Sequence, residues 1–295
     1  MTPSYLASAA QVTLSGLATG SLYAVLLLGV ILVFQVSKNI NFAYGQTGMV
    51  GAYASYALYA GAGVPVWLAL LLGVILAVLV AALTDLLIIR NIPTRQGFDL
   101  VVTLGELLLL TAFAQMVFGT SAQSYLKLLT DVASVRGGVF INANDLLCIA
   151  LGIIATIGGH VLLKHTSLGV SLRASAADAA IAQSVGIRVQ ALRTATWAVS
   201  GLLVCLGAML FAARLSVNAF YMTPIMINVF IAGMIGGLDR YWPPMMAAFG
   251  IAVYQSWATY LFGEPGGTPA LFVLVILVMG LVPRRYLEER HEARA

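Results

Sequence analysis

Charged residues are scarce in this sequence. They make up 9% of its 295 residues, whereas 61% of the residues are hydrophobic. A soluble domain carries about 25% charged residues and about 45–50% apolar ones. A soluble core of this length cannot hide so much apolar surface, so the chain is expected to use lipid as its solvent. The apolar runs are also continuous, unlike the short alternating strands of a membrane β-barrel.

Motifs for enzymatic chemistry are missing as well. The lysines of the chain are Lys38, Lys127 and Lys164, and none follows a glycine as in the phosphate loop of ATP-hydrolysing proteins. The Gly-x-Ser-x-Gly motif of hydrolases and the His-Glu-x-x-His motif of metalloproteases do not occur either. We therefore expect no enzymatic activity and no cofactor, and any energy that drives this chain must come from another protein.

Disulfide and metal-binding patterns are equally absent. Cys148 and Cys205 both lie in apolar runs and form no disulfide framework. His160 and His165 are five residues apart, which places them on different faces of a helix, and His291 is far from both. The net charge of +4 is only a weak signal for nucleic acid, and its uneven distribution along the chain explains it better. We expect neither a metal site nor a nucleic-acid partner.

Long apolar runs dominate what is present. About 20 apolar residues cross the hydrocarbon core of a bilayer as a helix, and no basic region of a signal peptide precedes the first run. The sequence therefore predicts one all-α polytopic membrane domain over residues 1–295, with eight or nine transmembrane or re-entrant helices. The second and seventh are glycine-rich or short, so either could be broken or re-entrant, which requires cover by protein or water. The expected segments are 12–34, 42–60, 66–89, 100–118, 146–163, 194–213, 227–238, 243–261 and 269–282.

Basic residues are distributed unevenly around these segments. If the polar stretch 166–193 is placed in the cytoplasm, every lysine and arginine falls on the cytoplasmic side except Lys127, Arg136 and Arg214. The positive-inside rule predicts this asymmetry. The N-terminus is then outside, and the C-terminus, with the charged tail 284–295, is cytoplasmic. The segment 119–145 becomes the longest outer loop, with room for a small cap.

The stretch 166–193, which we call the polar loop, is the most unusual part of the chain. It lies between two apolar runs and contains a helix too short to cross a membrane. Ser175 can cap this helix, with Asp178 three residues later as in a capping box, and Gly186 can end it. The pattern predicts one helix over 176–185, about 15 Å long. Its small residues form a shallow apolar face, which suits a groove in a partner protein better than lipid headgroups.

A second candidate region lies between the first two apolar segments. Asn39, Asn41, Tyr44 and Gln46 cluster where one apolar run ends and a glycine-interrupted run begins. Polar groups beside broken helices often line a substrate path in transporters. Such groups also satisfy the free backbone groups of helix ends. Both interpretations stay open.

Three acidic residues lie in or beside apolar runs. Glu106 lies well inside one run, where a charged carboxylate costs roughly 3 kcal/mol or more and is expected to face protein or water. We interpret it as a structural or pathway-lining group. The alternative is a proton site in a secondary transporter or channel that works alone. Asp85 and Asp99 lie near the ends of runs and are expected to be solvated.

Together these motifs resemble the LIV-type permeases of bacterial ABC importers, a family named for branched-chain amino acid uptake. The N-terminal part is similar to the family's GS-x-YAL and NFAHG…GAY patterns, with Tyr44 in place of the usual histidine. The polar loop is similar to the family's cytoplasmic LGR…RA…D…GI loop, and 233–238 is similar to a glycine-rich GGLGS segment. The most specific matches are Gly20-Ser21-Leu22-Tyr23-Ala24, Asn41-Phe42-Ala43-Tyr44-Gly45, Gly51-Ala52-Tyr53, Leu168-Gly169, Arg173-Ala174, Asp178 and Gly186-Ile187.

The resemblance implies the ABC importer permease fold and a transport subunit of the bacterial inner (plasma) membrane, surrounded by membrane lipid. The implied partners are a second permease in a heterodimer, two cytoplasmic ATPase subunits and a periplasmic substrate-binding protein. The short N-terminal region resembles the first permease of the usual pair. The implied substrates are branched-chain amino acids or related small polar solutes such as urea, amides and small organic acids. The residues expected to couple to the ATPases are Leu168, Gly169, Arg173, Asp178 and Gly186, and those expected along the translocation pathway are Tyr23, Asn39, Asn41, Tyr44, Gln46 and Glu106.

Overall fold

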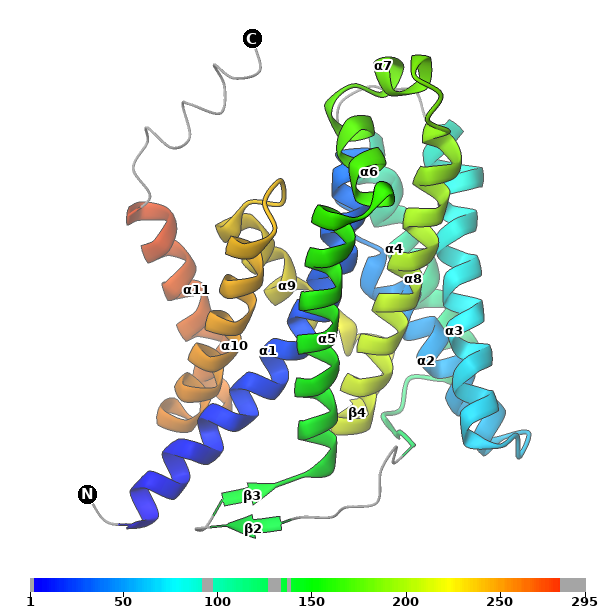
Figure 1. Cartoon of the computed structure of the whole chain (residues 1–295). Coiled ribbons are helices and arrows are strands. Elements are labelled where there is room, and N and C mark those ends of the chain that lie inside the picture. The colour runs from blue at the N-terminus through cyan, green and yellow to red at the C-terminus, as the bar shows by residue number, and fades with distance from the viewer. Residues whose placement is uncertain (1–2, 92–97, 127–133, 137–138, 282–295) are drawn as a thin grey trace.

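The computed structural model describes residues 3–91, 98–126, 134–136 and 139–281, and these form a bundle of helices (Figure 1). Helices α6 and α7 belong to the polar loop, and the other α-helices coincide with the expected apolar segments. The α-helices are α1 (Pro3–Ser37), α2 (Tyr44–Ala60), α3 (Val66–Leu83), α4 (Phe98–Phe118), α5 (Ala143–His165), α6 (Ser167–Ala177), α7 (Ala179–Ser184), α8 (Val189–Arg214), α9 (Met222–Gly236), α10 (Trp242–Phe262) and α11 (Glu264–Leu281).

Irregular turns and short strands complete the fold. Helix α3 continues into a π-helical turn η1 (Thr84–Ile88) and a 3-10 turn η2 (Ile89–Asn91). Strand β1 (Gln123–Ser124) pairs with β4 (Ser216–Val217), and β2 (Ser134–Arg136) pairs with β3 (Val139–Ile141), both antiparallel. These strands lie at the end of the bundle opposite to α6 and α7 (Figure 1). The chain is therefore mostly helical, as expected, and the segment 119–145, expected as the longest outer loop, contributes β1, β2 and β3. The tail 284–295 lies outside the described residues.

Helix α1 is the centre of the bundle. Of its most apolar stretch, 83% is buried inside the protein, and it packs against α5, α8, α9 and α10. Small residues allow this close approach. A Cβ on Gly16 would lie 2.8 Å from the Cα of Val253 in α10, and a Cβ on Gly152 of α5 would lie 2.7 Å from the Cα of Ser21. Helix α1 therefore touches its neighbours backbone to backbone.

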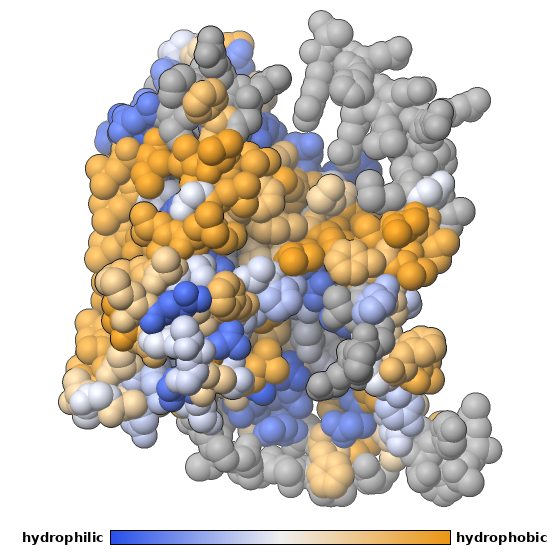
Figure 2. Space-filling view, turned by 180° about the vertical axis from the view of Figure 1, so that it is seen from behind, coloured by the Kyte–Doolittle hydropathy of each residue, from blue (hydrophilic) through white to orange (hydrophobic). Residues whose placement is uncertain are grey.

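Helices α3, α4 and α5 form the outside of the bundle. Only 22% to 28% of their most apolar stretches is buried inside the protein. Leu108 and Ile154, for example, are 68% and 65% exposed, and apolar side chains gather over much of the face shown in Figure 2. Within the described residues, α1, α3 with its turns, α4, α5 and α8 are long and apolar enough to cross a membrane. The chain is a multi-pass membrane protein, and the number of crossings stays a prediction.

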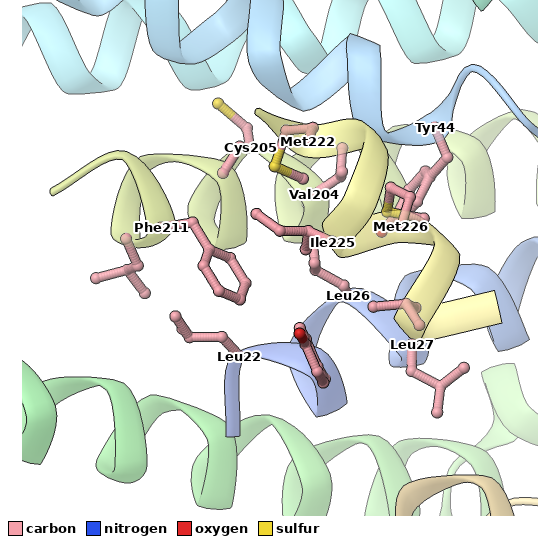
Figure 3. Packing of buried hydrophobic residues seen from close by; sticks show 14 of the residues in the cluster. Leu22, Leu26, Leu27, Tyr44, Val204, Cys205, Phe211, Met222, Ile225 and Met226 are labelled. Carbon is pink, nitrogen blue, oxygen red and sulfur yellow. The ribbon is translucent and has the colours of Figure 1, made fainter. Parts of the chain in front are cut away.

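Helices α2 and α9 are shorter than a bilayer. They have 17 and 15 residues, or about 25 and 22 Å of length, against a hydrocarbon core of about 30 Å. Both are unbroken, and their first turns meet in the core, where Gln46 donates a 3.1 Å hydrogen bond to Thr223. Figure 3 shows Met226 of α9 beside Tyr44 of α2, and Met222 beside Val204. Protein therefore covers the starts of both short helices, as a membrane requires.

Gly152 offers a test of this packing. We expect Gly152→Ala to destabilise the protein by about 1–3 kcal/mol, because the added methyl group overlaps the backbone of Ser21 on α1. The matched control is Gly158→Ala on the same helix, where nothing lies within 4 Å of the added group. It should be neutral or stabilise by up to about 1 kcal/mol through helix propensity. Thermal unfolding in detergent measures both, and equal effects of the two substitutions would contradict this packing.

Candidate functional site

The polar loop begins with α6, which is fastened to the end of α5. Thr166 Oγ1 accepts a 3.1 Å hydrogen bond from the backbone N–H of Gly169. A Cβ on Gly169 would lie 2.3 Å from the carbonyl oxygen of Leu163, so glycine lets α6 fold back against α5. The guanidinium of Arg173 donates a hydrogen bond to the same carbonyl. Leu168, in contrast, is 55% exposed.

Asp178 separates α6 from α7. Its backbone is extended (φ −153°, ψ 112°), and its Oδ1 accepts hydrogen bonds of 2.8 and 2.9 Å from the N–H groups of Ala180 and Ile181. The expected single helix over 176–185 is therefore wrong. Asp178 is the N-cap of a second helix, because its carboxylate satisfies the free N–H groups there. Ser175, the expected cap, is buried within α6.

Gly186 follows the end of α7, as the sequence predicts. Its φ of +90° lies in the left-handed region that favours glycine. The N–H of Ile187 bonds back to the carbonyl of Ala182 at 3.0 Å. Between the two caps, Ile181 and Val185 are 63% and 71% exposed. Helix α7 therefore presents a small apolar tip at this end of the protein (Figure 1).

A pocket of about 620 Å³ lies between α1, α8, α9 and α10, in the half of the bundle opposite to the polar loop. The side chains of Tyr23 and Gln255 line it, and the side chain of Asn228 hydrogen-bonds to both of them. The amide of Asn228 donates to the hydroxyl of Tyr23 at 2.8 Å and to Gln255 Oε1 at 3.0 Å. Tyr23 also donates to Gln255 Oε1 at 3.2 Å. Since this network uses the carbonyl oxygen of Gln255, the amide NH₂ of that side chain has no part in it.

Arg214 lines the same pocket, and the carboxylate of Asp145 balances its charge. Its Nη2 lies 3.1 Å from Asp145 Oδ1, and its Nη1 donates a 3.2 Å hydrogen bond to Thr19. Phe211 and Ile225 add apolar wall. Neutral polar groups on an apolar wall are typical of sites for small solutes. The balanced ion pair makes the pocket better suited to a neutral or zwitterionic solute than to a strongly charged one.

The structure places one expected pathway residue, Tyr23, on this pocket. Gln46 instead joins α2 to α9 in the core. Asn228 and Gln255 were not expected from the sequence. The available signal was weak, because each is a single amide within an apolar helix. Their meeting depends on the packing of α1, α9 and α10, which the sequence does not reveal.

The other polar residues near the start of α2 have separate partners. The Oδ1 of Asn41 accepts a 2.8 Å hydrogen bond from the N–H of Ala43, just before α2. Tyr44 is buried and donates a 3.1 Å hydrogen bond to the carbonyl of Ser200. Asn39 is half-buried in the loop between α1 and α2. The expected cluster is therefore spread over a loop, a helix start and the core.

Two acidic residues are buried on the other side of the bundle. Glu106 of α4 is buried and accepts a hydrogen bond from the hydroxyl of Thr84 in η1, away from the lining of the pocket. The expectation that Asp85 is solvated is wrong, since its side chain is 0% exposed. Arg193 and Thr194 contact it from α8. These partners are remote in sequence, which is why local pattern placed Asp85 at an exposed helix end.

Comparisons with known proteins agree over nearly the whole chain. A family model described as "Branched-chain amino acid transport system / permease component" matches residues 12–282. A probable branched-chain amino acid transport permease protein LivH of Methanocaldococcus jannaschii is 24% identical, over 88% of this chain and 85% of that protein. The high-affinity permease protein BraD of Pseudomonas aeruginosa is 23% identical over 91% and 92%, and LivH of Escherichia coli is 21% identical over 92% and 93%.

A solved structure shares the fold. It is "PsaBC from Streptococcus pneumoniae in complex with Fab", which matches with a TM-score of 0.54 at 12% sequence identity. The match covers 95% of this chain and 94% of that chain. At this identity the similarity concerns the arrangement of helices alone.

Proposed function

Because the chain belongs to the family of branched-chain amino acid transport permease components, we propose that it forms one half of the translocation pathway of an ATP-binding cassette importer. One observation carries the proposal. A pocket with polar and apolar walls lies in one half of the bundle, and a capped, protruding helical loop lies at the other end. Helix α8 runs from that loop to the pocket, since it begins at Val189 and ends at Arg214.

The polar loop is the proposed contact with an ATPase. The sequence contains no phosphate loop, so ATP must be hydrolysed by partner subunits. Ile181 and Val185 are large enough to fill a shallow protein groove, and the caps at Asp178 and Gly186 hold them in place. Two ATPase subunits, a second permease and a periplasmic substrate-binding protein complete the proposed assembly. Leu168, exposed on α6, would add to the same contact.

The proposed orientation puts the polar loop in the cytoplasm and the N-terminus outside. The distribution of lysine and arginine supports it. The pocket then lies in the periplasmic half, where a binding protein can deliver a solute. The short strands beside α5 and α8 would lie on the same side.

Branched-chain amino acids or related small polar solutes are the proposed cargo. The pocket offers amide and hydroxyl groups for the polar part of such a solute, and Phe211 and Ile225 for an aliphatic part. The balanced pair of Arg214 and Asp145 suits a zwitterion, which carries both charges. Urea and amides would use the same neutral groups, whereas small organic acids, which are anions at neutral pH, would fit this pocket less well.

Ile181 tests the docking of α7. We expect Ile181→Glu to weaken ATPase binding by about 10- to 100-fold, because a charge replaces the apolar side chain that the ATPase would bury, and to abolish ATP-driven leucine uptake in proteoliposomes. The matched control is Gln183→Glu, which adds the same charge to an exposed polar position of α7. Pull-down of the ATPase subunits measures binding. Equal binding by the wild type and Ile181→Glu would count against α7 as the docking helix.

Gln255 tests the pocket. We expect Gln255→Leu to lower leucine uptake by about tenfold, because it removes a polar contact and leaves Asn228 and Tyr23 without their acceptor. ATPase binding should not change, since the pocket and the polar loop lie in opposite halves. The control is Tyr254→Phe on the same helix, which removes a hydroxyl that bonds to Ala270 outside the pocket. Uptake that is unchanged by Gln255→Leu would exclude this pocket from the pathway.

A further inference from the structure

An ion pair between a buried carboxylate and a partly exposed guanidinium joins the end of α3 to the start of α8. Asp85 in η1 has a side chain that is 0% exposed, and its Oδ1 lies 2.7 Å from Nε of Arg193. Its Oδ2 accepts a 2.7 Å hydrogen bond from Thr194. We propose that this ion pair makes α8 and α3 move as one body and so transmits motion of α7 into the membrane part. The proposal rests on the proposed function, in which an ATPase moves α7.

The contact resists sliding of α8 along η1. Consecutive residues of α8 hold the two oxygens of one carboxylate, each at 2.7 Å. A slip by one residue moves a helix about 1.5 Å along its axis, which destroys the geometry of both contacts. A buried carboxylate that loses its cation is strongly destabilised. Rigid motion of the two elements together is therefore favoured over sliding.

Close packing continues the contact along the membrane. One turn beyond the ion pair, Trp197 of α8 is buried with Ile89 of η2. A Cβ on Gly201 would lie 2.7 Å from the Cβ of Ala81 and 2.8 Å from the carbonyl oxygen of Ala77. The backbones of α3 and α8 thus touch, and the ion pair fixes their register at one end.

The first half of the polar loop, α6, is attached to a different part of the bundle from the second half, α7, which leads into α8. Helix α6 is held against α5 by Gly169, Thr166 and Arg173, and it also packs against α1. The helical backbone is interrupted between the two halves at Asp178, where the chain is extended. Motion of α7 can therefore pass into α8 while α6 stays with α5. Asp178 would act as the hinge between α6 and α7. After this hinge, Arg193 binds α8 to η1 through Asp85.

The π-helical turn places Asp85 for this role. It interrupts α3 where the chain meets α8, and turns of this kind occur frequently at functional sites. The same turn presents Thr84 to Glu106 of α4. The moving body would therefore include α4, with Glu106 as an anchor near the middle of that helix.

The experiment uses the complete transporter, with its second permease and ATPases, in proteoliposomes. ATP hydrolysis and uptake of radiolabelled leucine are measured together. We expect Arg193→Gln to bind the ATPases and hydrolyse ATP as the wild type does, but to take up about tenfold less leucine per ATP. A residue needed only for folding would lower assembly, hydrolysis and uptake in parallel. The charge exchange of Asp85→Arg with Arg193→Asp should restore part of the uptake per ATP.

Two further variants keep the test informative if Arg193→Gln does not fold. Thr194→Val removes one hydrogen bond and leaves the ion pair, and Arg193→Lys keeps the charge but not the geometry. Both should lower uptake per ATP by less than Arg193→Gln, to about a third of the wild-type value. The control is Lys38→Gln, which removes an exposed ion pair with Asp239 at 3.1 Å. It should change uptake per ATP by less than about threefold, because exposed pairs contribute little.

The outcomes separate this inference from the proposed function. A wild-type complex that does not bind ATPases, or that shows no ATP-dependent uptake of leucine, urea, amides or small organic acids, would overturn the proposed function. A coupled wild type, together with folded Asp85 and Arg193 variants that keep the full uptake per ATP, would overturn the inference alone. Loss of uptake in the Lys38→Gln control equal to that in Arg193→Gln would also overturn it.

Discussion

The middle of a bilayer offers no water, so every backbone polar group there must find its partner within the protein. Long unbroken helices satisfy this demand alone, and α3, α4 and α5 can therefore stand on the outside with their side chains in lipid. The short helices α2 and α9 do not reach across the bilayer, so their ends need cover within the protein, and α2 packs against α8 while α9 packs against α1. Close approach of these central helices depends on glycine at contacts such as Gly152 with Ser21. The polar side chains of Tyr23, Asn228 and Gln255 likewise find their partners within the protein, since they bond to one another.

The same constraint shapes the route from the polar loop to the pocket. Charge inside a membrane protein is costly unless it is paired, and two ion pairs lie near the opposite ends of α8, Arg193 with Asp85 and Arg214 with Asp145. The first attaches α8 to the body of α3, and the second lies beside the pocket. In the function proposed, one continuous helix thus links the ATPase contact to the wall of the pathway. The interruption of the helical backbone at Asp178 separates α7 and α8 from α5 and α6.

Sequence reasoning succeeded where the signal is local. The apolar runs located the helices of the bundle, and Gly186 marked the end of α7 because a left-handed residue after a helix favours glycine. It failed where two local meanings compete or where the partner is distant. Asp178 fits both a capping box and an N-cap, and only the fold shows the second. Asp85 meets Arg193 from a remote helix, and the pocket amides Asn228 and Gln255 come from different helices. A single sequence contains no signal for such pairings.

In the proposed mechanism, α7, α8 and α3 move as one body relative to α5. Spin labels at Gln183 of α7, Leu79 of α3 and Ile154 of α5 test it most directly, since all three positions are exposed. Distances between the labels would be measured by pulsed electron resonance in the assembled transporter, without nucleotide and with ATP and vanadate. We predict that the distance from Gln183 to Leu79 stays constant while the distance from Leu79 to Ile154 changes. A changed distance from Gln183 to Leu79, with that from Leu79 to Ile154 unchanged, would contradict the account.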